Sequence, residues 1–120
     1  MDRFTDTDAA AHRLATERKA TVEQINALVR AHGEIIEAAT SVATDDEHDP
    51  EGPTIAFERA QAAAMLQRAQ TRLRDLDRAI VRLSQGGYGI CELCGLPIAP
   101  DRLDALPATR TCIACAGRAR

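Results

Sequence analysis

Apolar side chains recur at helical spacing over two long stretches of the chain. Between about residues 55 and 85 they step by three and four positions, which places them on one face of an α-helix. The stretch from Thr5 or Thr7 to about residue 44 has no proline and one glycine, Gly33, and shows a similar heptad-like spacing. We therefore predict two long amphipathic helices. Their apolar stripes comprise Val22, Ile25, Val29, His32, Ile36 and Ala39, widened by Leu28, Ile35 and Val42, in the first helix, and Leu66, Ala69, Leu73, Leu76, Ile80 and Leu83 in the second.

A polar segment separates the two stripes. Residues 45–53 contain two prolines, one glycine and no apolar aliphatic or aromatic side chain, a composition that ends a helix and turns the chain. Two helices joined by a short turn pack antiparallel, stripe against stripe. The predicted fold is mainly α, with a long antiparallel two-helix coiled-coil hairpin over residues 1–86 and an acidic tip loop at about residues 44–53. This loop is either a solvated turn or a functional tip, and its candidate functional acids are Asp45, Asp46, Asp49 and Glu51.

Composition and charge narrow the range of partners. Aromatic residues make up only 2% of the chain, so the side chains that usually anchor a globular core are almost missing. Residues 1–53 carry five basic and twelve acidic side chains, whereas residues 54–120 carry ten and six, which gives net charges of −7 and +4. Such opposed halves are better suited to docking on a patterned protein surface than to coating DNA.

All four cysteines stand in two CxxC pairs near the C-terminus. Seventeen residues separate the pairs, and this spacing is typical of a structural zinc site with four thiolate ligands. The competing interpretation is a pair of disulfides or a redox-active CxxC, but a redox motif normally accompanies a βαβ pattern, which is missing here. We expect one Zn²⁺ in a small C-terminal module, residues 87–120, where it would clamp a hairpin that is marginal alone. The expected ligands are Cys91, Cys94, Cys112 and Cys115.

The residues around the cysteines resemble those of a known family. The chain reads Gly87-Tyr88-Gly89-Ile90-Cys91, Cys94-Gly95, Pro97-Ile98, Arg102-Leu103, Ala105, Pro107 and a closing Cys112–Cys115 pair, and these residues are similar to the DksA/TraR-type zinc finger. A coiled coil with an acidic tip directly upstream matches the same family. The resemblance implies a bacterial transcription factor that binds RNA polymerase through its secondary channel. Its tip would lie near the active site and alter open-complex lifetime and initiation.

The tip departs from the family pattern. Family members often read Asp-x-x-Asp-x-Ala there; Asp46 and Asp49 fit the two acids, and Glu51 replaces the alanine. In a second alignment Asp49-Pro50 matches an Asp-Pro of the family, and Gly52 replaces the second acid. Both alignments retain Asp49.

The zinc module differs from the family pattern in two further respects. Members of the family that bind ppGpp together with the polymerase carry a basic residue before the zinc-loop proline and another after the last cysteine. Leu106 and Ala116 occupy these positions, so we expect little response to ppGpp. The helix that usually follows the zinc site is reduced to a stub.

A zinc ribbon that binds nucleic acid directly is the alternative function. The arginine-rich second helix and the tail from Gly117 to Arg120 favour it, whereas the net charge of −3 and the scarcity of aromatic side chains for base stacking oppose it. An enzyme is not expected, because four thiolates leave no open position on the metal and no nucleophile–base pair stands out. His32 lies in a helical stripe, so we expect it to pack there and not to bind metal.

The remaining expectations concern location and assembly. No apolar run reaches membrane-spanning length, and the N-terminus lacks the apolar region of a signal peptide. With reduced cysteines, these features predict a cytoplasmic protein. We expect a monomer that acts on RNA polymerase, without a membrane partner and without sequence-specific DNA binding.

Overall fold

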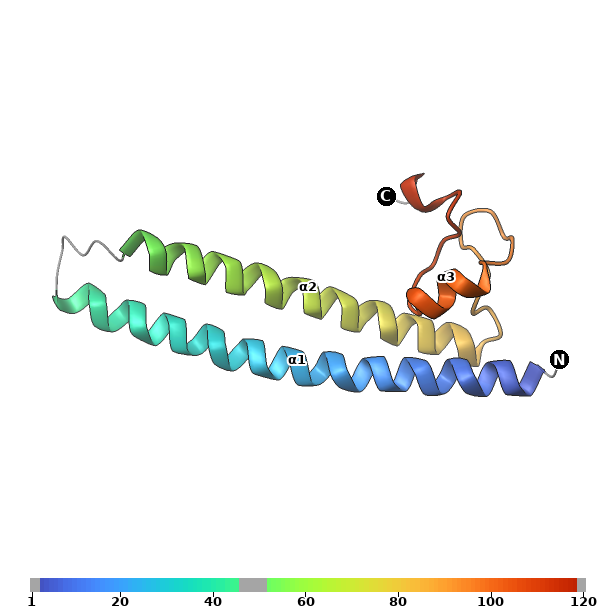
Figure 1. The fold of residues 1–120 in the computed structure, drawn as a ribbon, viewed down its shortest axis with the longest axis horizontal. Helices are drawn as coiled ribbons and strands as arrows, with labels where there is room; N and C mark the ends of the chain where they lie inside the picture. Colours follow the sequence, from blue (N-terminus) through green and yellow to red (C-terminus); the bar gives the residue numbers. More distant parts are fainter. Residues whose placement is uncertain (1–2, 46–51, 119–120) are drawn as a thin grey trace. The chain divides into compact units, whose positions relative to one another are not determined.

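The chain folds as two long helices followed by a small irregular module (Figure 1). The computed structural model describes the backbone of residues 3–45 and 52–118, and the side chains of residues 7–37 and 52–118. The helices are α1 (Arg3–Asp45), α2 (Gly52–Ser84) and α3 (Pro100–Ala105), and a 3₁₀ turn, η1, covers Ala116–Arg118. The described residues form no strand, only an isolated antiparallel bridge between Ile90 and Pro97. The prediction of a mainly α hairpin is confirmed.

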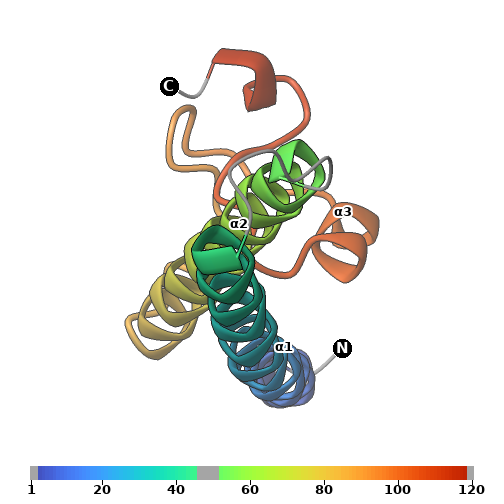
Figure 2. The same cartoon turned by 90° about the vertical axis from the view of Figure 1, so that its left-hand side faces the viewer.

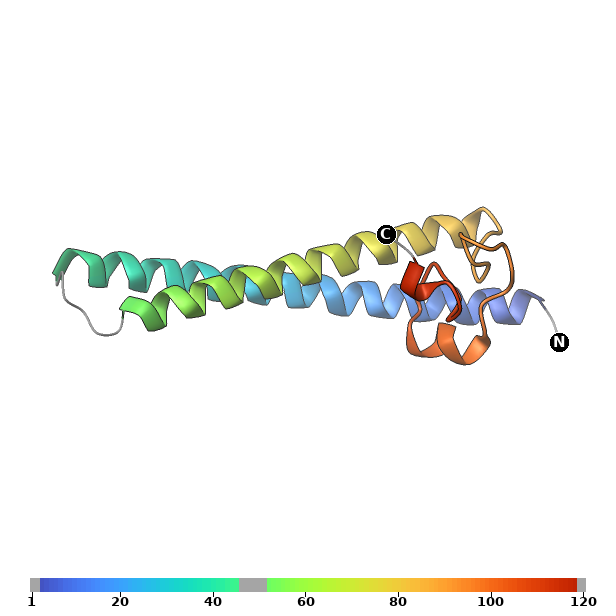
Figure 3. The same ribbon diagram turned by 90° about the horizontal axis from the view of Figure 1, so that it is seen from above.

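The chain divides into two compact units. Unit 1 contains residues 1–20 and 72–120, and unit 2 contains residues 21–71. Each unit therefore holds one stretch of α1 and one stretch of α2, which lie side by side and run antiparallel (Figures 1 and 3).

Unit 1 holds an apolar core between the two helices. Leu14 of α1 and Leu76 of α2 are fully buried, and Ala79 lies with them. Ile80 and Leu83 of α2 pack against this cluster. The apolar stripe predicted for the second helix is therefore the face that α2 buries in this unit.

The buried positions of unit 2 carry shorter side chains than those of unit 1. In the end-on view of Figure 2, the teal stretch of α1 and the green stretch of α2 lie next to each other. The buried positions here are Thr21 of α1 and Ala62 and Ala69 of α2. Small residues such as these bury little apolar area each, so they stabilise the pairing of the helices less than the leucines of unit 1.

The apolar stripe of α1 differs in part from the prediction. Val29 and Ile36 are 50% and 44% exposed, whereas Leu28 and Ile35 are half-buried. The packed face therefore keeps Val22, Ile25 and His32 of the predicted stripe and adds the two positions that the prediction treated as its edge. With apolar residues at both neighbouring positions, the spacing alone fits either choice, and only the partner helix distinguishes them.

The helix ends follow the chemistry of their residues. The helix α2 begins at Gly52, ahead of the start predicted at about residue 55, because Pro53 in a first turn loses no hydrogen bond that the helix would make. It ends at Ser84, and Gly86 then adopts a φ of 84°, the left-handed conformation that glycine allows at the end of a helix. Asp45 closes α1, and its side chain lies outside the described residues, as do Asp46, Asp49 and Glu51.

Candidate metal centre

The first cysteine pair sits on a tight turn between two short extended segments. The bridge between Ile90 and Pro97 pairs these segments, and the Cys91 amide donates to the Leu96 carbonyl over 2.8 Å. The Gly95 amide donates to the Cys91 carbonyl over 2.9 Å and closes the turn. Gly95 has a φ of 76°, which a residue with a Cβ atom adopts only with strain.

The second cysteine pair is held by a turn that runs into η1. The Cys115 amide donates to the Cys112 carbonyl over 3.1 Å, and the Arg118 amide donates to the Cys115 carbonyl over 2.9 Å. The helix α3 precedes this pair, and its Arg102 side chain donates to the Thr111 carbonyl over 2.9 Å. This hydrogen bond fixes the segment that leads into Cys112.

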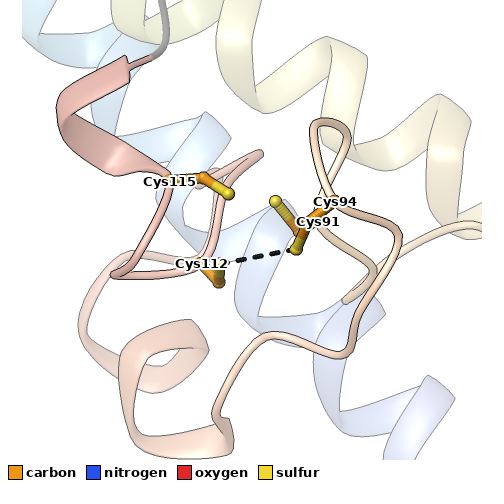
Figure 4. Close-up of side chains that lie close together, drawn as sticks. All are labelled: Cys91, Cys94, Cys112 and Cys115. Carbon is orange, nitrogen blue, oxygen red and sulfur yellow. Dashed lines mark hydrogen bonds between the residues drawn. The ribbon is translucent and has the colours of Figure 1, made fainter.

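These two turns bring the four sulfur atoms together (Figure 4). All four Sγ atoms lie within 4.8 Å of one another, and the thiols are free. Sulfurs about 2.3 Å from a tetrahedral zinc would be about 3.8 Å apart, and the Cys94 and Cys112 sulfurs are separated by 3.7 Å. Cys91 and Cys115 are buried with Ile98, and Leu103 packs against them. The four cysteines are positioned to bind one metal ion.

The protonation of the thiols explains why the site needs a cation. Backbone hydrogen bonds, first from Cys112, lower the pKa of Cys91 to about 6. The pKa of Cys115 is raised to about 12, first by its hydrogen bond with the Cys112 side chain and then by burial. A backbone hydrogen bond from Leu96 lowers the pKa of Cys94, but burial and hydrogen bonds with neighbouring thiols outweigh it and raise the pKa. Cys91 therefore holds a negative charge readily, whereas Cys94 and Cys115 resist ionisation, and a divalent cation removes that resistance. This donor set fits Zn²⁺.

Arg82 connects the end of α2 to the first cysteine turn. Its Nη2 donates to the Gly87 carbonyl over 2.7 Å and to the Ile90 carbonyl over 2.8 Å. Its Nη1 lies 2.8 Å from a carboxylate oxygen of Glu92, and its side chain is only 20% exposed. Arg82 lies outside the apolar stripe predicted for this helix, where charged side chains are usually solvated, so the sequence pattern does not indicate this role. The two glycines that follow the helix could have indicated it, because a glycine turn leaves backbone carbonyls exposed within reach of a side chain in the last turn.

Tyr88, which packs against the cluster of Leu14, Leu76 and Ala79, and Arg13 connect the zinc module to the helices within unit 1. The Tyr88 hydroxyl donates to the Pro107 carbonyl over 2.7 Å, and burial raises the pKa of this phenol. Arg13 of α1 lies 3.3 Å from a carboxylate oxygen of Asp104 in α3. The sequence does not indicate the ion pair between Arg13 and Asp104, since these residues lie 91 positions apart and belong to no common motif.

The remaining predicted positions are exposed or lie elsewhere. Leu106 and Ala116, which stand where relatives carry cations, are both exposed in unit 1. His32 is half-buried in unit 2 and is not part of the metal-ligand cluster found among the described side chains. None of the helices, over the residues described, combines the length and apolar content needed to cross a membrane.

The fold and the site define the class: a two-helix hairpin that carries a four-cysteine zinc finger. Residues 86–120 match the family model of the prokaryotic dksA/traR C4-type zinc finger. Residues 86–120 therefore carry a zinc finger of this family, and the resemblance seen in the sequence is confirmed for that module. One Zn²⁺ per chain follows from the family and from the four cysteines positioned to bind it.

Individual relatives match over different lengths. The structure of transcription factor DksA2 from Pseudomonas aeruginosa aligns with a TM-score of 0.77 and 22% identity, covering 95% of this chain and 82% of that one, and so shares its fold. An uncharacterized protein of Aquifex aeolicus is 50% identical over 44 residues, or 37% of this chain. YteA, an uncharacterized protein of Bacillus subtilis, is 35% identical over 66 residues, or 55% of this chain. These two matches span 30% and 28% of the relatives' own lengths.

Proposed function

We propose that this protein regulates transcription by binding RNA polymerase through its secondary channel. The tip of the helical hairpin would point toward the active site and modulate initiation and the stability of open complexes. One observation carries the proposal: a zinc finger of the DksA/TraR family follows a two-helix hairpin with the fold of a known transcription factor, DksA2. The choice of RNA polymerase as the partner, and of its secondary channel as the binding site, rests on the resemblance to the DksA/TraR family noted in the sequence.

The zinc module has a structural role in this proposal. Four thiolates from Cys91, Cys94, Cys112 and Cys115 fill a tetrahedral coordination shell, so a bound Zn²⁺ supplies folding free energy and no open position for a substrate. We therefore propose no catalytic activity. The module would hold the ends of α1 and α2 and present a surface for the polymerase.

The acidic tip would act by electrostatics. Carboxylates delivered into a narrow channel act at short range and with little screening, so they can contact basic groups or perturb a metal-binding region of the polymerase. We propose Asp49 as the main acting residue, since both alignments with the family pattern retain it, and Asp46 as the second. Asp45 and Glu51 complete the proposed tip.

Direct nucleic-acid binding is less favoured by the pairing of the arginines. At least five arginines form ion pairs with acids of the same chain, which leaves them less available for phosphate. They are Arg13, Arg18, Arg72, Arg82 and Arg110.

A binding assay distinguishes the two functions. Purified zinc-loaded protein, immobilised through a tag, should retain core RNA polymerase, and random duplex DNA should not shift with it at physiological salt. A salt-sensitive shift of duplex DNA without retention of the polymerase would replace the proposal with the nucleic-acid alternative. Competition by an unrelated protein known to occupy the secondary channel would then locate the binding site.

A further inference from the structure

A carboxylate lies between two guanidinium groups at the junction of the zinc module and α2. Arg82 Nη1 lies 2.8 Å from Glu92 Oε1, and Arg110 Nε lies 3.8 Å from Glu92 Oε2. Arg82 belongs to the last turn of α2, Glu92 to the first CxxC turn, and Arg110 to the segment before the second. The three charges therefore come from the three parts of the chain that must meet for the site to form.

Glu92 joins the two cysteine pairs twice. Besides its side-chain contact with Arg110, its backbone amide donates to the Arg110 carbonyl over 2.8 Å. Glu92 directly follows Cys91, and Arg110 lies two residues before Cys112. The link therefore fixes one ligand pair against the other at a point close to the sulfurs.

Arg82 extends this link to the helix. Its second amino group donates to the carbonyls of Gly87 and Ile90, so the residues between α2 and Cys91 wrap around one guanidinium group. The side chain of Glu92 is 29% exposed and that of Arg82 is 20% exposed, so solvent screens this pair less than it screens a fully exposed one.

We propose that Glu92 is a positioning residue for the zinc ion, and that Arg82 couples metal occupancy to the last turn of α2. Glu92 touches no sulfur in the contacts described here. It acts by holding the two cysteine pairs at binding distance, so that less chain entropy is lost when the metal binds. Residues that orient metal ligands in this way typically change metal affinity 10- to 100-fold when they are replaced.

The first test measures zinc affinity by competition with a chromogenic chelator. Glu92→Gln should bind zinc about 10- to 100-fold more weakly than the wild type, because the amide keeps the shape but loses the charge between the two arginines. Asp104→Asn is the matched control, since it also removes a carboxylate paired with an arginine of unit 1, at 3.3 Å from Arg13. Its affinity should stay within about twofold of the wild type. Equal affinities of the two variants would overturn the role of Glu92.

The second test separates positioning from general loss of structure. Arg82→Gln should also weaken zinc binding, although Arg82 has no contact with a cysteine among those described. The double variant Arg82→Gln, Glu92→Gln should then lose less zinc affinity than two independent effects would give. Its fold-loss should be at least about threefold smaller than the product of the two single fold-losses. Strictly multiplicative losses would overturn the coupling. These measurements need only the protein, zinc and a chelator, and helical circular dichroism of the zinc-loaded variants verifies that each is folded.

Hydrogen exchange adds a readout at the helix itself. In the wild type, removal of zinc should increase amide exchange in the last turn of α2 and the residues that follow it, about residues 80–87, as well as in the cysteine loops. In Arg82→Gln the α2 amides should exchange at similar rates with and without zinc, while the loops still respond. An unchanged response of α2 in this variant would also overturn the coupling.

Discussion

Arg18 of α1 and Asp77 of α2 form an ion pair of 2.6 Å between residues 59 positions apart in the sequence. A second pair, Arg72 with Glu17, lies on the same two helices at 2.6 Å. Together they fix the register of α1 against α2 in unit 1. All four side chains are 40–48% exposed, so solvent screens both pairs and they add little to the stability of the fold. These contacts contribute more to the specific alignment of α1 with α2 than to stability.

Stability should depend instead on the apolar contact between Leu14 and Leu76. We predict that Leu76→Ala lowers the free energy of unfolding by about 2–5 kcal/mol, because this fully buried side chain would leave a cavity between the helices. Val81→Ala, which shortens a side chain that is 51% exposed on the same helix, should change it by about 0.5 kcal/mol or less. Urea unfolding of the zinc-loaded proteins measures both. Equal losses would mean that the packing between α1 and α2 contributes little.

Metal content should be one zinc ion per chain. Elemental analysis of protein purified under reducing conditions should give one equivalent, and all four thiols should resist a thiol reagent until a chelator is added. The buried cluster at the metal site consists of Cys91, Ile98 and Cys115, which is too small to hold the module firmly, so removal of zinc should loosen the module. Detection of two disulfides under these conditions would contradict the zinc assignment.

Zinc binding should release protons. The pKa of Cys115 is raised to about 12 and that of Cys94 is also raised, so both are protonated in the metal-free protein at pH 7.5 and must lose a proton to bind zinc. Cys91, with a pKa of about 6, is already ionised at that pH. Apparent zinc affinity should therefore rise with pH above 7. Calorimetric titrations in buffers of different ionisation enthalpy should show at least two protons released, and a value near zero would contradict these assignments.

The nucleotide ppGpp should have little effect on this protein's action. Leu106 and Ala116 offer no cation at the positions where ppGpp-binding relatives carry one, and phosphate recognition depends on charge-assisted hydrogen bonds. Transcription assays with a polymerase that lacks any other ppGpp site should give the same result with and without the nucleotide. Synergy that requires this protein would show that other residues bind the phosphates.

Neutralising the tip should separate binding from effect. Under the proposed function, Asp49→Asn should leave polymerase affinity nearly unchanged, because the helices and the zinc module would supply most of the contact. The change in open-complex lifetime should be lost, since the carboxylate that acts near the active site is gone. Lifetimes measured at saturating protein for the wild type, Asp49→Asn and a control, Glu37→Gln, decide the matter. Equal open-complex lifetimes for the wild type and Asp49→Asn would mean that the acidic segment is a solvated loop without a role in regulation.

Much of the fold could be predicted from local pattern. The steps of three and four from Leu66 to Leu83 define one helix face, and Gly86 ends the helix because few other residues adopt its φ of 84°. The CxxC pairs predicted a metal site for a similar local reason, since each turn needs only neighbouring residues to aim two sulfurs at one point. Signals of this kind are contained in a few consecutive residues.

The tertiary structure decided which of several equivalent positions make contact. Leu28 and Val29 fit the α1 stripe equally well in the sequence, and only packing against α2 buries the first and exposes the second. Arg82 likewise looks like any other charged residue of a helix until the chain after Gly87 turns back and brings Glu92 to its side chain. Such contacts depend on where distant segments meet, and that is set by the sum of many weak interactions over the whole chain.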